Sequence, residues 1–200
     1  SIWNNGDCAV LIDWRIPFGK ALALMESVSA ENCFIERRFF ENNSFSSNIQ
    51  FQIFDVQGNG VMLIPDDVMD LYNENMSCDE AVILFSSGTT GEAKGIALSH
   101  YAININANAI QQYIQLTASS NIQIVKSLSH SSTLVGELLV SLKVKCNIFI
   151  SSTQILPNRL IQHLIKLNID IVCVNPTLLQ LYCKIIETNN FQIKELKYIY

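Results

Sequence analysis

The chain alternates short apolar runs with longer segments whose apolar residues recur every three or four positions. Runs of strand length occupy residues 7–13, 32–36, 81–85, 96–98, 122–128, 146–151, 169–174 and 197–200. Segments with helical spacing occupy residues 17–29, 99–116, 133–143, 157–168 and 175–188. Strands that alternate with helices form parallel sheets covered by helices on both faces. The pattern therefore predicts an α/β fold, with a three-layer αβα arrangement around a mainly parallel sheet.

Residues 49–65 depart from this rhythm. Within the segment Ile49–Phe54, apolar and polar residues alternate as far as Ile53, which is typical of a half-buried strand. A turn with two glycines follows, and residues 60–65 are predicted to pair back as an antiparallel accessory hairpin. Residues 66–75 are predicted to form a short helix and a linker.

The most informative stretch follows the apolar run Ala81–Phe85. Within ten residues it gathers three glycines, four hydroxyl side chains and one cation: Gly88, Gly91 and Gly95; Ser86, Ser87, Thr89 and Thr90; and Lys94. Glycine lets the backbone turn and lets its N–H groups approach a ligand closely. Successive N–H groups in such a turn form a concave anion site, to which a lysine adds a point charge. This combination favours binding of a polyphosphate.

Two other interpretations apply to a run of this kind. A Ser/Thr/Gly-rich segment after a strand is also typical of a solvated loop with no ligand. The Walker P-loop requires an adjacent Gly-Lys pair followed by Ser or Thr. Here Lys94 is followed by Gly95, and Glu92 and Ala93 separate it from Gly91. The spacing therefore excludes the Walker motif.

The stretch resembles the phosphate loop of the adenylate-forming (AMP-binding) enzyme superfamily, which includes acyl-CoA synthetases, luciferases and the adenylation domains of peptide synthetases. That signature has a hydroxyl residue followed by Ser-Gly-Thr-Thr-Gly-x-Pro-Lys-Gly, then a short strand and often Ser/Thr-His. Residues 86–95 read Ser-Ser-Gly-Thr-Thr-Gly-Glu-Ala-Lys-Gly, and the match closes at Ser99-His100. Ala93 stands where the family usually has proline, a change that removes no hydrogen-bond donor. Nearly the whole chain matches, in order, the central part of the family's large N-terminal domain.

The resemblance implies an activity and a set of ligands. Family members use ATP and Mg²⁺ to convert a carboxylate into an acyl-adenylate, and usually pass the acyl group to coenzyme A or to the phosphopantetheine arm of a carrier protein. The residues it assigns to the ATP phosphates are Ser86, Ser87, Gly88, Thr89, Thr90, Gly91 and Lys94. The resemblance assigns no metal ligand in this chain.

Two later segments resemble the family's acyl pocket. Ser127-Leu128-Ser129-His130 keeps the Leu and the His of a Pro-Leu-aromatic-His segment but lacks its Pro and its aromatic residue. His130 follows a predicted strand, where binding residues of α/β proteins are often found, although a hydrogen-bonded structural histidine fits equally well. Asn175, Pro176 and Thr177 follow the strand predicted at 169–174 and match another pocket segment. The substrate-pocket hypothesis therefore includes His130, Asn175, Pro176 and Thr177.

Composition narrows the class of protein. The net charge is −5 and no block of like charges occurs, which disfavours nucleic acid as a partner. No uncharged apolar run approaches the roughly 18 residues that a membrane span needs, and no signal peptide pattern opens the chain. The six cysteines are scattered and lack metal-ligand spacing, so they are predicted to be reduced core residues of a cytoplasmic protein.

The 200 residues suit one domain, and that domain is expected to be incomplete. Family members continue with segments for adenine, metal and ribose, and then with a small domain that carries a catalytic lysine. None of these is found here, so the chain is expected to be a fragment of a ligase and to be inactive alone. The alternative is a non-catalytic nucleotide-binding or interaction module. Because 49% of the residues are hydrophobic and only 16% are charged, a homo-oligomer formed through exposed apolar surface is also expected.

Overall fold

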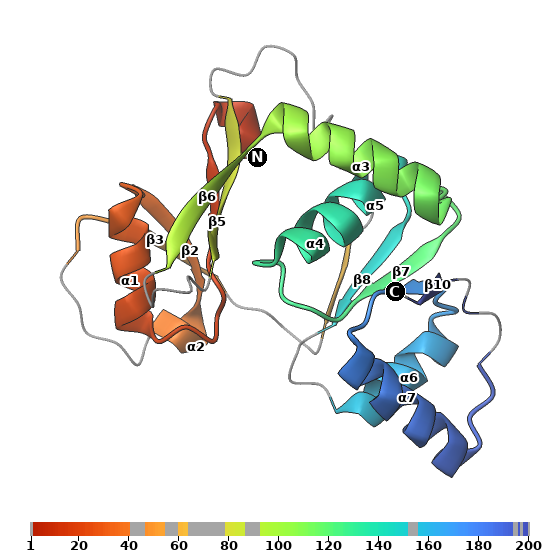
Figure 1. Cartoon of the computed structure of the whole chain (residues 1–200). Coiled ribbons are helices and arrows are strands. Elements are labelled where there is room, and N and C mark those ends of the chain that lie inside the picture. The colour runs from red at the N-terminus through yellow and green to blue at the C-terminus, as the bar shows by residue number, and fades with distance from the viewer. Residues whose placement is uncertain are drawn as a thin grey trace. The chain divides into compact units, whose positions relative to one another are not determined.

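The protein is described here from a computed structural model. The structure describes residues 2–40, 47–54, 60–63, 79–86, 93–151, 156–193, 196, 198 and 199. Contacts group the chain into two compact units (Figure 1). Unit 1 comprises Ser1–Gly58 and Met76–Ser99, and unit 2 comprises Asn59–Asn75 and His100–Tyr200. The prediction of one domain over residues 1–200 stays a prediction.

Unit 1 contains two small sheets. Its elements are a 3-10 turn (Trp3–Asn5), β1 (Ala9–Leu11), α1 (Phe18–Ser27), β2 (Asn32–Glu36), α2 (Arg37–Phe40), β3 (Gln50–Phe54), β5 (Glu80–Ser86) and β6 (Lys94–Ser99). The three-stranded sheet has the order β1-β5-β6, with β1 parallel and β6 antiparallel to β5. Strands β2 and β3 form a separate parallel pair. The middle strand β5 is the strand predicted from the run 81–85.

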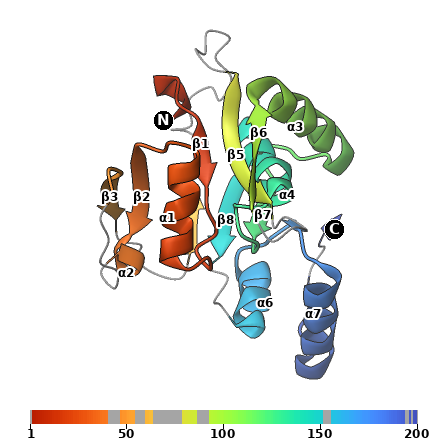
Figure 2. The ribbon, with the colours of Figure 1, turned by 60° about the vertical axis from the view of Figure 1, so that its left-hand side comes forward.

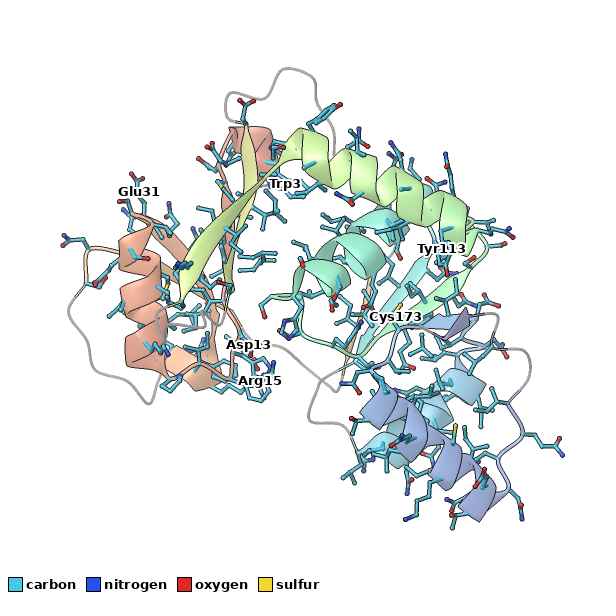
Figure 3. The ribbon with its side chains drawn as sticks, in the orientation of Figure 1. Trp3, Asp13, Arg15, Glu31, Tyr113 and Cys173 are labelled. Carbon is cyan, nitrogen blue, oxygen red and sulfur yellow. The ribbon has the colours of Figure 1, made fainter. Side chains whose placement is uncertain are left out.

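Burial anchors β5 in unit 1. Ala81 and Val82 are fully buried, and the indole Nε1 of Trp3 donates a hydrogen bond to the carbonyl of Ala81 at 2.8 Å (Figure 3). Helix α1 begins directly after Pro17, as the sequence predicts, because proline fixes a backbone angle that suits a helix start. These contacts hold fixed the strand from which the phosphate-loop stretch departs.

Unit 2 is a five-stranded sheet covered by helices on both faces. Its elements are β4 (Gly60–Leu63), α3 (His100–Ile114), β7 (Asn121–Ile124), α4 (Ser131–Thr133), a π-helical turn (Leu134–Leu139), α5 (Val140–Val144), β8 (Asn147–Ser151), α6 (Pro157–Lys166), β9 (Ile171–Val172), α7 (Pro176–Asn189) and β10 (Tyr198–Ile199). The strand order is β10-β9-β7-β8-β4, and only β4 is antiparallel to its neighbour among these described strands.

Two clusters of buried side chains define the layers of unit 2. On one face, Ile122 and Ile148 of the sheet pack with Ala107 of α3 and Val140 of α5. On the other face, Val172 belongs to a cluster with residues of α6 and with Tyr182 of α7. Figures 1 and 2 show these helices around the strands. The mainly parallel αβα architecture expected from the sequence is confirmed.

The hairpin predicted at residues 49–65 is wrong. The alternating segment does form β3, but it pairs in parallel with β2, in register from Asn32↔Gln50 to Glu36↔Phe54. The segment predicted to pair back forms β4, which runs antiparallel to β8 in unit 2. Alternation reports that a strand has one buried face, and it does not report which strand lies beside it. The helix predicted at 66–75 lies outside the described residues.

The cysteine prediction holds in part. The five cysteines that the structure describes are thiols and form no disulfide, and Cys146 and Cys173 are buried as expected. Cys8 and Cys33 are only half-buried, and Cys183 is exposed on α7, so it is not a core residue. Cys78 lies outside the described residues.

No helix among the described residues is long and apolar enough to span a bilayer.

Candidate phosphate and substrate site

The β5–β6 hairpin frames the candidate phosphate loop. Its ladder ends with the pairs Phe85↔Gly95 and Ser86↔Lys94. The hydroxyl of Ser86 donates a hydrogen bond to the carbonyl of Lys94 at 3.4 Å. The fold therefore brings the first and the last of the predicted phosphate-binding residues side by side at one end of a hairpin.

The two ends of the hairpin differ in charge. Lys94 is exposed at the loop end, where Ser86 is half-buried. The acidic residue Glu80 lies at the opposite end of the ladder, opposite Ser99. A cation and a hydroxyl group at the mouth of the loop fit a polyphosphate ligand. The other predicted phosphate residues, Ser87, Gly88, Thr89, Thr90 and Gly91, lie outside the described residues.

Gly95, the residue after Lys94, lets β6 pack closely against side chains of β5. A Cβ atom at this position would lie 3.3 Å from Cγ2 of Ile83 and 3.5 Å from Cε1 of Phe85, both on β5. It would also lie 3.8 Å from Cγ1 of Val28, which follows α1. A contact of 3.3 Å to a branched side chain requires that the neighbour move. The absence of a side chain at residue 95 thus helps to fix where Lys94 leaves the sheet.

Substituting Gly95 with valine is expected to destabilise the protein by at least about 1 kcal/mol, because the branched side chain overpacks the hairpin. The matched control is Ala97→Val, since Ala97 is exposed on the same strand. Chemical denaturation of both variants measures the difference. Equal unfolding midpoints for the two variants would show that the close approach at Gly95 has no energetic importance.

The predicted substrate-pocket residues lie in unit 2. His130 is exposed, and its extended backbone precedes α4. The carbonyl of His130 accepts hydrogen bonds from the N–H groups of Thr133 at 3.0 Å and Leu134 at 2.9 Å. The backbone of His130 therefore starts the helix, while its imidazole is available to a ligand.

Asn175 has a structural role that the sequence analysis did not assign. Its side-chain oxygen accepts a hydrogen bond from the N–H of Leu178 at 2.8 Å, so Asn175 is the N-cap of α7. Pro176 occupies the first helical position, where a missing N–H carries no penalty. Thr177 is exposed in the first turn. The cap explains the Asn-Pro pair without a ligand, and it also fixes the position of Thr177.

The sheet brings the two pocket segments to one edge. His130 lies beyond the carboxyl end of β7, and Asn175 lies beyond the carboxyl end of β9. The two strands are parallel neighbours, paired at Ile122↔Ile171 and Gln123↔Val172. Ligands of α/β proteins bind outside the carboxyl ends of the strands. The topology of unit 2 thus places both predicted segments where such a ligand would bind.

A comparison with protein-family models shows to which family the chain belongs. The family model described as AMP-binding enzyme matches residues 27–199, which is most of the chain. The chain belongs to the AMP-binding enzyme family. The match includes the β5–β6 hairpin and both pocket segments, so the resemblance noted in the sequence is confirmed.

Individual relatives agree with the family. The mitochondrial medium-chain acyl-CoA ligase of Bos taurus is 42% identical over 72 residues, which cover 34% of this chain and 12% of that protein. The N-terminal domain of FACL13 from Mycobacterium tuberculosis has a TM-score of 0.75 at 14% identity, over 97% of this chain and 50% of that one. A long-chain fatty-acid–CoA ligase from Archaeoglobus fulgidus has a TM-score of 0.74 at 19% identity, over 99% of this chain and 40% of that one. The chain spans half or less of the length of these proteins.

Sequence reasoning missed one charged pair in this AMP-binding family member. The Nζ atom of Lys126 lies 2.8 Å from Oε1 of Glu137, and the Glu137 side chain is 1% exposed. A signal was present, because Glu137 is the single acidic residue in the apolar segment 133–144. A lone carboxylate inside a predicted buried helix needs a partner, since an unpaired buried charge is strongly unfavourable.

Unit 1 also contains an open cleft of approximately 1480 Å³. It is lined by residues of β1, α1 and β2, and none of the predicted site residues contributes to it. Across the described ranges, no group of three or more His, Cys, Asp or Glu side chains could hold a metal ion. The AMP-binding fold thus offers the hairpin loop and the edge beyond β7 and β9 as its candidate sites.

Proposed function

We propose that this chain is part of an ATP-dependent ligase that activates a carboxylate as an acyl-adenylate and then transfers the acyl group to a thiol. The observation that carries the proposal is the hairpin of an AMP-binding family member, with Ser86 and Lys94 paired at the mouth of a Ser/Thr/Gly-rich loop. The acceptor thiol would belong to coenzyme A or to a carrier-protein arm. The names of the relatives favour coenzyme A.

The loop residues would bind the β- and γ-phosphates of ATP. Lys94 would supply a positive charge, and Ser86, Ser87, Thr89 and Thr90 would donate hydroxyl hydrogen bonds, while Gly88 and Gly91 would admit the phosphates close to the backbone. Donors placed here stabilise the negative charge that develops on the leaving pyrophosphate. Bound Mg²⁺ would neutralise part of the phosphate charge. No general base is needed, because the substrate carboxylate is itself the nucleophile.

The carboxylate would bind at the edge beyond β7 and β9. The exposed His130 imidazole and the Thr177 hydroxyl are the polar groups that the two segments offer. Asn175 and Pro176 would shape the pocket through the start of α7, because the Asn175 side chain is engaged as the helix cap. Medium-chain fatty acids are the first substrates to test, since a relative is named for them.

Carboxylate-dependent exchange of labelled pyrophosphate into ATP tests the proposed function. It should be measured with Mg²⁺ and a panel of carboxylates on the parent ligase of which residues 1–200 are proposed to be part, because residues 1–200 alone are expected to be inactive. The proposal expects exchange with at least one carboxylate, and loss of that exchange in the Lys94→Ala variant. Nucleotide binding without exchange for any carboxylate would support a non-catalytic nucleotide-binding module instead.

We also propose that the chain self-associates through α3. Tyr101, Ile105 and Tyr113 are 76%, 48% and 77% exposed, and with the exposed Ala109 they recur every four residues along one face. The helix carries no Asp, Glu, Lys or Arg. An antiparallel second copy would place Ile105 against the small Ala109 and Tyr101 against Tyr113. This complementary fit, without like charges to repel, makes a second copy the expected partner.

Combining Tyr101→Lys with Tyr113→Lys is therefore expected to shift the protein to a monomer in light scattering at high concentration. The control combines Gln162→Lys with Gln180→Lys, which adds the same charge at exposed positions on α6 and α7. A wild-type protein that stays monomeric, or a control that dissociates equally, would contradict the α3 interface.

The cytoplasmic location expected from the sequence stays a prediction.

A further inference from the structure

A buried carboxyl group lies close to both pocket segments of unit 2. Glu137 is on the π-helical turn Leu134–Leu139, between α4 and α5. Its side chain is 1% exposed and forms an ion pair of 2.8 Å with Lys126, whose own side chain is 26% exposed. Single π-helical turns occur frequently at functional sites. Burying two charges costs about as much free energy as their attraction returns, so stability alone does not explain an ion pair at this position.

Three different segments face the Glu137 carboxyl group. Lys126 comes from the connection after β7, Thr133 from α4, and Cys173, which is labelled in Figure 3, from the residues after β9. Burial raises the pKa of Glu137 to about 7, against the lowering effects of the Lys126 ammonium and of interactions with Thr133 and Cys173. Lys126 and Cys173 are the titratable groups that face it. Its protonation state therefore changes in the neutral pH range.

These contacts surround the predicted pocket residues along the chain. Lys126 is four residues before His130, and Thr133 is three residues after it. Cys173 is two residues before Asn175. Because β7 and β9 are adjacent and parallel, one side chain can reach both connections at the same edge of the sheet. Glu137 thus pairs with the connection that carries His130 and lies near Cys173 in the connection that carries Asn175.

We propose that Glu137 is a positioning residue whose ion pair with Lys126 holds the connections after β7 and β9 in the arrangement that binds the carboxylate substrate. The proposal rests on the proposed function for its substrate and on the contacts above for its mechanism. When Glu137 is protonated, the attraction is lost and the partly exposed ammonium of Lys126 can turn to solvent. The His130 connection then loosens, and the carboxylate binds less well.

Hydrogen–deuterium exchange on the chain itself tests the positioning role. After correction for intrinsic exchange, residues 126–134 and 173–178 should exchange roughly tenfold faster at pH 6 than at pH 8, in keeping with the loss of a charged hydrogen bond. Glu137→Gln should exchange fast at both pH values, and Lys126→Gln should do the same from the other side of the pair. The exposed Glu187→Gln is the matched control and should behave like the wild type.

Comparing the KM for the carboxylate with the KM for ATP tests whether the Glu137–Lys126 pair affects binding of the carboxylate substrate. In the wild type the carboxylate KM should fall as pH rises through about 7, while Glu137→Gln keeps the high value throughout and the ATP KM stays unchanged. Exchange in the two segments that does not depend on pH, or a carboxylate KM that does not follow it, would overturn the role of Glu137. Absence of carboxylate-dependent activity in the wild type at every pH would overturn the proposed function instead.

Discussion

Replacing Lys94 with alanine is expected to weaken binding of ATP and of pyrophosphate by about 1–3 kcal/mol, the contribution typical of a hydrogen bond to a charged group. The reason is the position of Lys94, which is exposed at the mouth of the loop opposite Ser86. AMP lacks the β- and γ-phosphates that Lys94 would contact, so AMP affinity should change little. Isothermal titration with ATP, pyrophosphate and AMP measures all three affinities.

The control for Lys94 is Lys184→Ala, which removes one positive charge from an exposed position on α7. If the effect of Lys94 were a general change in net charge, the two variants would lose affinity equally. A loss of AMP affinity as large as the loss of ATP affinity would also contradict the assignment, because it would place Lys94 near the α-phosphate or the nucleoside.

The second large effect is a dependence of stability on pH that Glu137 confers. Its pKa is about 7 in the folded protein, above the ordinary value of 4.5, because burial disfavours the charged form. Between these values the folded state binds more protons than the unfolded state, so the free energy of unfolding falls as pH rises. At about 1.4 kcal/mol per pKa unit, the loss contributed by Glu137 is about 3 kcal/mol, and it is complete only above pH 7.

Glu137→Gln should remove this contribution, since glutamine does not titrate. Denaturation with urea at pH 5, 6, 7 and 8 should show the wild type losing stability relative to Glu137→Gln as pH rises. Parallel curves for the two proteins would mean that the carboxyl group titrates normally. The free energy of unfolding thus falls as pH rises, whereas the hydrogen exchange proposed for residues 126–134 and 173–178 slows as pH rises. If the pair had only a structural role, global stability and local protection from exchange would change with pH in the same direction.

Much of this fold could be predicted from the sequence, because most strands are short apolar runs and the helices α1, α3, α6 and α7 have 10 to 15 residues with helical spacing of their apolar positions. The run 81–85 became the buried strand β5, and the helix expected after Ser99 begins at His100. The helical segments predicted to begin at residues 17, 157 and 175 form α1, α6 and α7, because the backbone preferences of proline and of a capping asparagine act locally at a helix start. The candidate phosphate loop was predicted in the same way, from residues adjacent in sequence, and it stays a prediction.

The failures concern partners that are distant in the sequence. Strands β3 and β4 were recognised as strands but assigned to each other, whereas they pair with β2 and β8. Their partner choice depends on long-range packing, which alternation does not encode. The Lys126–Glu137 pair was missed although the lone acidic residue of the segment 133–144 indicated a buried carboxylate, because the sequence does not show which cation the fold brings to it. The exposed Cys183 shows that position within an apolar segment does not determine which face a residue occupies.

Titration of the isotope-labelled chain with inorganic pyrophosphate, followed by NMR at the backbone amides, tests whether residues 86–95 form the phosphate site. Saturable chemical-shift changes should concentrate at residues 86–95, and Lys94→Ala should weaken them while Lys184→Ala leaves them unchanged. Absence of saturable shifts at residues 86–95, or shifts concentrated elsewhere in the chain, would contradict the assignment of this loop as the phosphate site.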